Sequence, residues 1–240
     1  MNCIAMIPAR YASTRFPGKL MQKLGSKTVI RHTHDNTVKT GLFDRVIVVT
    51  DSQIIFDEIK SHGGEVMMSR RSHESGSDRI AEAVEDLDID IVVNVQGDEP
   101  FVQKAPLEKL LAVFRQEPKV QVASLMQIMK DQKNIEDPNF VKVAVDRQMN
   151  ALFFSRSVIP YPRDPAIPTH YYEHIGVYAF RKKALLQFTQ WPVTPLEAAE
   201  KVECLRYLEH GIPLKMVLTE YMGVEIDTPE DLQLAQQRLD

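Results

Sequence analysis

A cation-rich loop opens the chain. The stretch IPARYASTRFPGK (7–19) carries Arg10, Arg15 and Lys19, and residues 1–34 contain six Lys or Arg but no Asp or Glu. Forked guanidinium groups and an ammonium, on a loop that two prolines stiffen, suit the oxygens of a phosphate chain. The loop lacks the glycine spacing of a P-loop or of a dinucleotide-binding fingerprint. We therefore expect a pocket for a small polyanion, with solvated surface cations as the alternative.

Two carboxylates stand directly after apolar runs. Asp98 follows the run at 89–96 and a glycine, Gly97, that permits close approach, while Asp227 follows a predicted strand at 223–226. The carboxyl ends of parallel strands meet at one edge of a sheet, so we expect both carboxylates in one crevice. Carboxylate oxygens bind Mg²⁺ while phosphates fill its remaining positions. A turn or helix cap is the alternative role for Asp98.

A third polar loop, SRRSHESGSDR (69–79), leads into a predicted helix. Ser75, Gly76 and Ser77 offer backbone and hydroxyl contacts to a base or ribose, and Arg79 stands in the first helical turn. An ordinary N-cap at Ser77 explains much of this pattern without any ligand. Alone, the loop predicts a binding site only weakly.

The elements that must position these loops alternate between strands and helices. Apolar runs at consecutive positions indicate strands covered on both faces, and the segments between them have a helical period. This pattern predicts an α/β fold in three layers, with a mostly parallel central sheet between two layers of helices. The predicted strands are 3–8, 45–51, 65–69, 89–96 and 120–126, and the predicted helices are 27–41, 51–64, 77–87 and 105–116.

The pattern changes after residue 127. We expect paired strands at 140–146 and 151–155, followed by a Pro-rich exposed loop at 157–168 that can form neither a helix nor a central strand. The rest is predicted as a strand at 173–181, a helix at 195–211 and a strand at 213–218. A short strand and a capped helix that begins near Thr228 follow within 223–240. We expect one domain, 1–240.

Composition excludes several classes of protein. The 240 residues carry a formal net charge of −4, and an acidic chain is a poor nucleic-acid binder. The apolar runs are too short to span a bilayer, and nothing predicts a membrane partner or an export signal. Cys3 and Cys204 match no zinc or disulfide pattern, so we expect a cytoplasmic protein in a reducing compartment.

Seven motifs are spread over nearly the whole length of the chain: IPARYASTRFPGK, HESGSDR, VNVQGDEP, FFSRSVIPYPRD, HIGVYAF, TPLE followed by VECLRYLEHG, and VEIDTPEDL. In their order and spacing the chain resembles the CMP-Kdo synthetases, the 3-deoxy-manno-octulosonate cytidylyltransferases. The opening motif is shared with CMP-sialic acid synthetases, but the set as a whole is far more specific.

The resemblance implies an activity and an assembly. The enzyme would join CTP and Kdo (3-deoxy-manno-octulosonate) into CMP-Kdo with release of pyrophosphate, using Mg²⁺, for lipopolysaccharide synthesis. It implies a nucleotide-diphosphosugar transferase fold, which is Rossmann-like, and a homodimer. Residues of about 127–180 would include the dimerisation subdomain.

The resemblance also implies roles for individual residues. Lys19, Arg10, Asp98 and Asp227 would be catalytic, with Asp98 and Asp227 as the metal ligands. The nucleotide would be bound by Ala9, Arg10, Ser13, Arg15, Lys19, Ser75, Gly76 and Arg79. The sugar would be bound by Gln96, Arg156, His174, Tyr178 and Glu203.

Three positions depart from the family pattern. Glu173 stands where an arginine is usual, Cys204 where a glutamine is usual, and Leu20 where a proline follows the lysine. The first two lie near the expected sugar site, so an 8-amino analogue of Kdo, another ulosonic acid or a sialic acid stays open as the sugar. A glycosyltransferase is a further alternative, but the motif QGDEP gives the pair Asp98-Glu99 and no D-x-D. A non-catalytic nucleotide-binding regulator is disfavoured by the intact metal-site residues.

Overall fold

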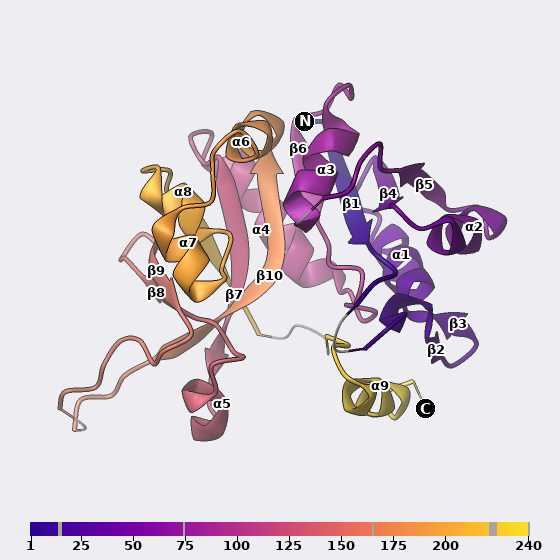
Figure 1. Cartoon of the computed structure of the whole chain (residues 1–240). Coiled ribbons are helices and arrows are strands. Elements are labelled where there is room, and N and C mark those ends of the chain that lie inside the picture. The colour runs from indigo at the N-terminus through magenta and orange to yellow at the C-terminus, as the bar shows by residue number, and fades with distance from the viewer. Residues whose placement is uncertain (14–15, 74, 165, 221–224, 240) are drawn as a thin grey trace.

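A computed structural model describes residues 1–13, 16–73, 75–164, 166–220 and 225–239. In these residues one nine-stranded sheet has the order β11-β7-β10-β6-β1-β4-β5, with β8 beside β10 and β9 beside β8 (Figure 1). The strands are β1 (Cys3–Ala9), β2 (Lys23–Leu24), β3 (Lys27–Thr28), β4 (Arg45–Thr50), β5 (Glu65–Met68), β6 (Ile91–Asn94), β7 (Val122–Met129), β8 (Lys142–Val145), β9 (Ala151–Ser155), β10 (Tyr171–Arg181) and β11 (Leu214–Thr219). The pair β2 and β3 forms a separate small sheet.

Helices cover both faces of the large sheet. They are α1 (Val29–Lys39), α2 (Gln53–Ser61), α3 (Gly76–Val84), α4 (Lys104–Gln116), α5 (Gln132–Glu136), α6 (Lys182–Phe188), α7 (Pro195–Glu200), α8 (Leu205–Glu209) and α9 (Pro229–Gln236), with a short 3₁₀ helix, η1 (Lys19–Met21). Alternate side chains along each strand point to opposite faces of the sheet and belong to two separate hydrophobic cores. One core packs against α1, α2 and α4, and the other packs against α3, α6 and α8. The predicted three-layer arrangement is therefore confirmed.

The strands that carry the candidate site run parallel. β1 pairs with both β4 and β6 in parallel register, and the residues of β1 are buried at nearly every position because helices cover both of its sides. The loops after β1, β4 and β6 therefore emerge at the same edge of the sheet. β10 is antiparallel to β6 and β7, so its first residues lie at that edge too.

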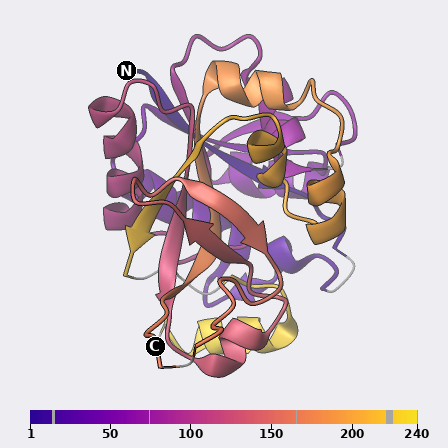
Figure 2. The ribbon, with the colours of Figure 1, turned by 90° about the vertical axis from the view of Figure 1, so that its left-hand side faces the viewer.

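The β8–β9 hairpin branches from the main strand order of the large sheet. β8 and β9 pair antiparallel, as predicted, and β8 touches β10 at one residue pair. In Figure 2 the two strands of this hairpin face the viewer. The described part of the Pro-rich segment forms a long extension that reaches away from the sheet (Figure 1). The side chains of Leu152, Tyr161 and Ile167 are 63%, 82% and 63% exposed.

Several elements differ from the sequence prediction. The helix expected at 195–211 is two helices, α7 and α8, because the backbone at Lys201 adopts a left-handed conformation (φ 54°) that ends α7. Helices α5 and α6 were not predicted, since both are short. No strand is formed at Glu225 and Ile226, where the Ile226 N–H instead donates to the Asp98 carbonyl at 3.0 Å. The remainder of the strand predicted at 223–226 lies outside the described residues.

Candidate functional site

A cavity of about 270 Å³ lies at the carboxyl ends of β1 and β6. Its lining brings together seven of the eight residues that the sequence predicts for nucleotide binding. The eighth, Arg15, lies outside the described residues. The residues that line the cavity are Pro8, Ala9, Arg10, Ser13, Lys19, Leu20, His73, Ser75, Gly76, Arg79, Gln96, Gly97, Asp98 and Asp227.

Lys19 joins the three segments that meet at this cavity. Its ammonium forms ion pairs with the carboxylates of Asp98 and of Asp227, the latter at 2.6 Å. The side chains are only 15%, 14% and 23% exposed, in that order. Burial disfavours the charged ammonium, but the two carboxylates outweigh this and raise the pKa of Lys19 above its usual value. Lys19 is thus a fixed cation at neutral pH.

The local chain explains how Lys19 reaches this place. Gly18 adopts a left-handed conformation (φ 66°), which favours glycine, and its N–H donates to the Tyr11 carbonyl at 3.3 Å. The turn leads directly into η1, in which the Met21 N–H donates to the Gly18 carbonyl at 2.9 Å. A tight turn and a 3₁₀ helix therefore hold the backbone at Lys19 in place.

Asp98 and Asp227 are positioned by backbone contacts. Gly97 lets the two loops approach, because a Cβ at this position would stand 3.0 Å from the Pro8 carbonyl oxygen. Asp227 precedes α9, whose N-terminus is closed by a reciprocal capping box between Thr228 and Asp231. The Asp227 N–H also donates to the Asp231 carboxylate at 3.1 Å, so the cap that the sequence predicted holds Asp227 beside the loop after β6.

The loop before α3 forms another wall of the cavity. Ser75, not Ser77, is the N-cap of this helix, since its hydroxyl accepts from the Asp78 N–H at 3.1 Å. The prediction of a cap at Ser77 was wrong: its buried hydroxyl donates to Glu203 at 2.7 Å. The N-cap of α3 therefore lies two residues earlier than predicted. The sequence has a serine at both positions, so either could have been the cap.

Arg79 lines the same cavity but is already paired. Its guanidinium donates to Asp51 at 2.6 Å and to Ser69 at 3.2 Å, and only 5% of the side chain is exposed. The same contact, through its hydrogen bond, lowers the pKa of Asp51. These contacts of the buried Arg79 side chain brace the loops after β4 and β5, so Arg79 offers a ligand a rigid wall more than a free charge.

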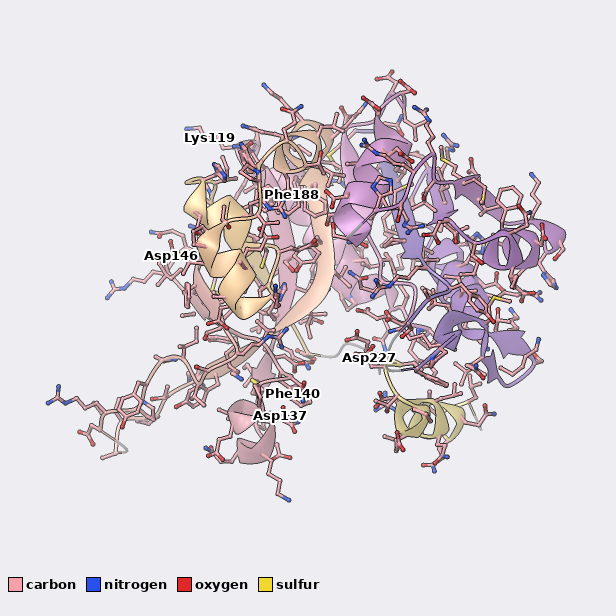
Figure 3. All side chains as sticks on the ribbon, viewed as in Figure 1. Lys119, Asp137, Phe140, Asp146, Phe188 and Asp227 are labelled. Atoms are coloured by element: carbon pink, nitrogen blue, oxygen red, sulfur yellow. The ribbon has the colours of Figure 1, made fainter. Side chains whose placement is uncertain are left out.

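A second and larger cavity, of about 1000 Å³, adjoins the first at Asp227. It is lined by four of the five predicted sugar-binding residues, namely Arg156, His174, Tyr178 and Glu203. Asp137 and Phe140 line it near the β8 end and Asp227 lines it near α9; Figure 3 labels these three residues around the space. The fifth, Gln96, lines the smaller cavity instead, and its amide donates to the Gly176 carbonyl at 3.0 Å.

His174 is neutral in this cavity wall. Burial lowers its pKa to about 3. Its Nε2 lies 3.1 Å from the Ser124 hydroxyl, and its ring contacts Phe154 and Tyr178. A neutral imidazole provides one donor and one acceptor, which suits sugar hydroxyls better than it suits a carboxylate.

Glu203 and Arg156 are held by contacts with neighbouring elements. Burial raises the pKa of Glu203, while the bond from Ser77 opposes this shift. The Arg156 guanidinium donates to the carbonyl of Glu200 at 2.7 Å and to that of Pro138 at 2.8 Å. Both side chains are thus fixed in position before any ligand binds.

Two of the three departures from the family pattern, Glu173 and Cys204, lie in or against the larger cavity. The Glu173 carboxylate accepts from Gln127 at 2.8 Å, and burial raises its pKa. Cys204 is fully buried behind Tyr178 and bonds to its hydroxyl, so its thiol fills space in the wall. Leu20, the third departure, is buried beside Lys19.

Two residues of the site were missed in the sequence. His73 lines the smaller cavity, with a side chain 4% exposed and 3.2 Å from Glu82. Glu225 forms a cluster with Asp98 and Asp227 in which one oxygen of each lies within 4.8 Å of the others. Each stands inside a quoted motif. Only the distance in space, which a sequence does not contain, could have selected them.

Comparison with known proteins identifies the family. The model of the cytidylyltransferase family matches residues 4–218. The 3-deoxy-manno-octulosonate cytidylyltransferase of Flavobacterium johnsoniae is 59% identical over 100% of this chain and 99% of its own length. The chain belongs to this family of cytidylyltransferases. The namesake enzyme of Christiangramia forsetii is 57% identical over 98% of this chain and 96% of its own.

A solved structure agrees with the sequence relatives of the cytidylyltransferase. CMP:2-keto-3-deoxy-manno-octonic acid synthetase, solved in complex with CTP, superposes with a TM-score of 0.95 at 35% identity, over 100% of this chain and 98% of that one. A 4-diphosphocytidyl-2C-methyl-D-erythritol synthase from Anaerococcus prevotii, 21% identical with a TM-score of 0.65 over 99% of this chain and 98% of its own, shares the fold. Among the described residues, no helix has the length and apolar character needed to cross a bilayer.

The residues present fit the metal that the family implies. Three clustered carboxylates are the hard oxygen donors that Mg²⁺ prefers, and the ammonium of Lys19 lies against two of them. The place therefore suits a positive charge. Asp98 and Asp227 both line the cavity that would receive the phosphates.

The buried imidazole gives a stability prediction. Because His174 holds a pKa of about 3 in the folded protein and the usual value is 6.5, the unfolded chain binds the extra proton between these values. The free energy of unfolding should therefore fall as pH drops below about 6.5, by up to about 1.4 kcal/mol per pH unit from this residue. We expect His174→Gln to flatten the curve in urea titrations between pH 6 and pH 5. Parallel curves for the two proteins would show that His174 is not buried as described.

Proposed function

We propose that this protein activates Kdo by joining it to CTP, giving CMP-Kdo and pyrophosphate. The observation that carries the proposal is the 59% identity to a 3-deoxy-manno-octulosonate cytidylyltransferase over the whole chain. The two adjoining cavities support it, because a nucleotide and a sugar acid need separate places that meet at one reacting centre. That meeting point is Asp227, which lines both cavities.

The reaction forms one bond and breaks one bond. The anomeric hydroxyl oxygen of Kdo would attack the α-phosphorus of CTP, the bond from that phosphorus to the bridging oxygen would break, and the hydroxyl proton would pass to solvent. Lys19 and Arg10 would stabilise the charge that grows on the departing pyrophosphate. Lys19 is suited to this role because its neighbours keep it protonated, and Arg10 because it is exposed at the cavity rim.

We propose Asp98 and Asp227 as the residues that hold Mg²⁺. When bound there, the ion would neutralise phosphate charge and lower the pKa of the attacking hydroxyl. The protein's own part is to bring two remote carboxylates to one place, by the close approach at Gly97 and by the cap of α9. A dedicated side-chain base is not required by this arrangement.

The side chains that line the larger cavity favour a second candidate substrate as well. The larger cavity is lined by two cations, Arg156 and Lys201, and by seven carboxyl groups: Glu99, Asp137, Glu173, Glu203, Glu225, Asp227 and Asp231. This excess of carboxyl groups favours a sugar rich in hydrogen-bonding groups, among them an 8-amino analogue of Kdo. Arg156 is the group placed to bind the sugar's own carboxylate. A sialic acid or another ulosonic acid is the remaining alternative.

We further propose a cytoplasmic enzyme that serves lipopolysaccharide synthesis, in keeping with the family. CTP is an intracellular metabolite, and both cysteines, Cys3 and Cys204, are buried free thiols, as a reducing compartment permits. Neither nucleic acid nor a membrane is proposed as a partner. The chain as a single domain, with its dimerisation subdomain at about 127–180, is part of the same proposal.

The reaction is tested by pyrophosphate release. We expect release only when CTP, Mg²⁺ and a ulosonic acid are all present, with Kdo, its 8-amino analogue and a sialic acid compared at equal concentration. Asp98→Asn and Asp227→Asn should each abolish release while leaving the far-UV circular dichroism unchanged. Consumption of CMP-sugar without free CTP would instead identify a glycosyltransferase. Normal turnover in either Asn variant would remove that residue from the metal site.

Lys19 should contribute to rate more than to substrate binding. We expect Lys19→Ala to lower kcat by at least about 10²-fold, the scale for losing one group that stabilises transition-state charge. Lys23→Ala, an exposed lysine on β2, is the matched control and should keep full activity. A loss confined to the KM for the sugar would assign Lys19 to the other substrate.

The proposed homodimer is tested by the size of the protein in solution. The exposed apolar side chains of Leu152, Tyr161 and Ile167 lie in and beyond the hairpin, and a second copy of the chain would cover them. We expect sedimentation velocity to give a dimer, and Leu152→Asp to shift it toward the monomer. A wild-type monomer at micromolar concentration would reject the proposed homodimer.

A further inference from the structure

Three carboxylates, not two, surround the reacting centre. Asp98 and Asp227 were expected there from the family, but Glu225 was not. One oxygen of each lies within 4.8 Å of the others, a spacing that a single cation can bridge. Glu225 is exposed, and it lines the larger cavity together with Asp227.

The ammonium of Lys19 occupies part of the same space. It is bound to Asp98 and to Asp227, so each of these carboxylates has committed an oxygen to it. A metal ion held by the same oxygens at about 2.1 Å would overlap the ammonium position or displace it. The three carboxylates and the lysine together carry a formal charge of −2, which would favour a divalent cation at this place.

We propose that Glu225 is a third carboxylate ligand of this cation site and that the Lys19 ammonium occupies the site until the phosphates of a nucleoside triphosphate draw it away. The inference rests on the proposed function, because it assumes that a triphosphate binds in the cavity beside Arg10 and Ser13. It adds a ligand that the family pattern does not assign.

The arrangement sets the order in which the ligands arrive. Without nucleotide, a metal ion must compete with a lysine that the structure holds by two ion pairs. With nucleotide, the phosphate oxygens offer the ammonium equivalent partners and release Asp98 and Asp227. Metal affinity should therefore be low in the free enzyme, and the nucleotide should raise it.

The test is Mn²⁺ binding to the nucleotide-free full chain, read from the electron paramagnetic resonance signal of free Mn²⁺. Replacing the resident cation by Lys19→Met should tighten Mn²⁺ binding on the order of tenfold or more, the usual scale of coupling between competing ligands. Lys19→Gln, which keeps a polar side chain, should act in the same direction and serves if the first variant folds poorly.

Glu225 is tested in the Lys19→Met background. Glu225→Gln should weaken Mn²⁺ binding about tenfold there, because affinity in such sites follows the number of charged ligands. Glu230→Gln, an exposed acid in the first turn of α9 outside the cluster, is the matched control and should leave binding unchanged. Equal weakening by both variants would indicate only a general loss of negative charge and would reject Glu225 as a ligand.

Two results separate this inference from the proposed function. If Mn²⁺ affinity is the same in the wild type and in both Lys19 variants, the lysine does not occupy the metal site, and the inference is overturned even where the wild type releases pyrophosphate. If the wild type releases no pyrophosphate with any sugar, the proposed function fails, whereas the Mn²⁺ titrations still report on the cation site.

Discussion

The bond of one ammonium to two carboxylates holds the functional part of this molecule together. Lys19 comes from the loop after β1, Asp98 from the loop after β6, and Asp227 from the segment before α9. Two carboxylates about 4 Å apart repel by about 4 kcal/mol at an effective dielectric constant of 20. A cation is therefore required to keep them together in a partly buried place, and in the nucleotide-free protein that cation is a lysine.

The rest of the fold serves this constraint. One parallel strand on each side of β1, β4 and β6, brings the loops to one edge, and the antiparallel β10 brings its first residues to the same edge. The smaller and the larger cavity can then share Asp227 as a common wall. A chain that is acidic as a whole has a positively charged segment, residues 1–34, where two anionic substrates would meet.

The sequence predicted the layers and the loops well because both follow from local rules. Consecutive apolar positions identify covered strands, and this was enough for β1, β4 and β6. The family motifs then selected the residues predicted to bind the nucleotide. All of them line the smaller cavity except Arg15, which lies outside the described residues. Ser77 was misassigned because two serines stand within one turn, and the choice between them depends on Glu203, which is 126 positions away.

Contacts between remote segments could not be predicted. The ion pairs of Lys19 join residues 79 and 208 positions apart, and the approach of Glu225 depends on where α9 begins. Likewise the break between α7 and α8 depends on one left-handed residue, Lys201, that no periodicity signals. Residue types indicated which groups could do the chemistry. Only their distances showed that a lysine and a metal ion need the same oxygens.

A crystal structure with a non-hydrolysable CTP analogue and Mn²⁺, with the metal located by its anomalous scattering, would show most directly whether Lys19, Asp98 and Asp227 form one site for triphosphate and metal. We expect Mn²⁺ bound directly to oxygens of Asp98 and Asp227, with the Lys19 ammonium moved onto the phosphates. Manganese bound elsewhere, or Lys19 still between the two carboxylates with the nucleotide in place, would show that the three residues do not form such a site.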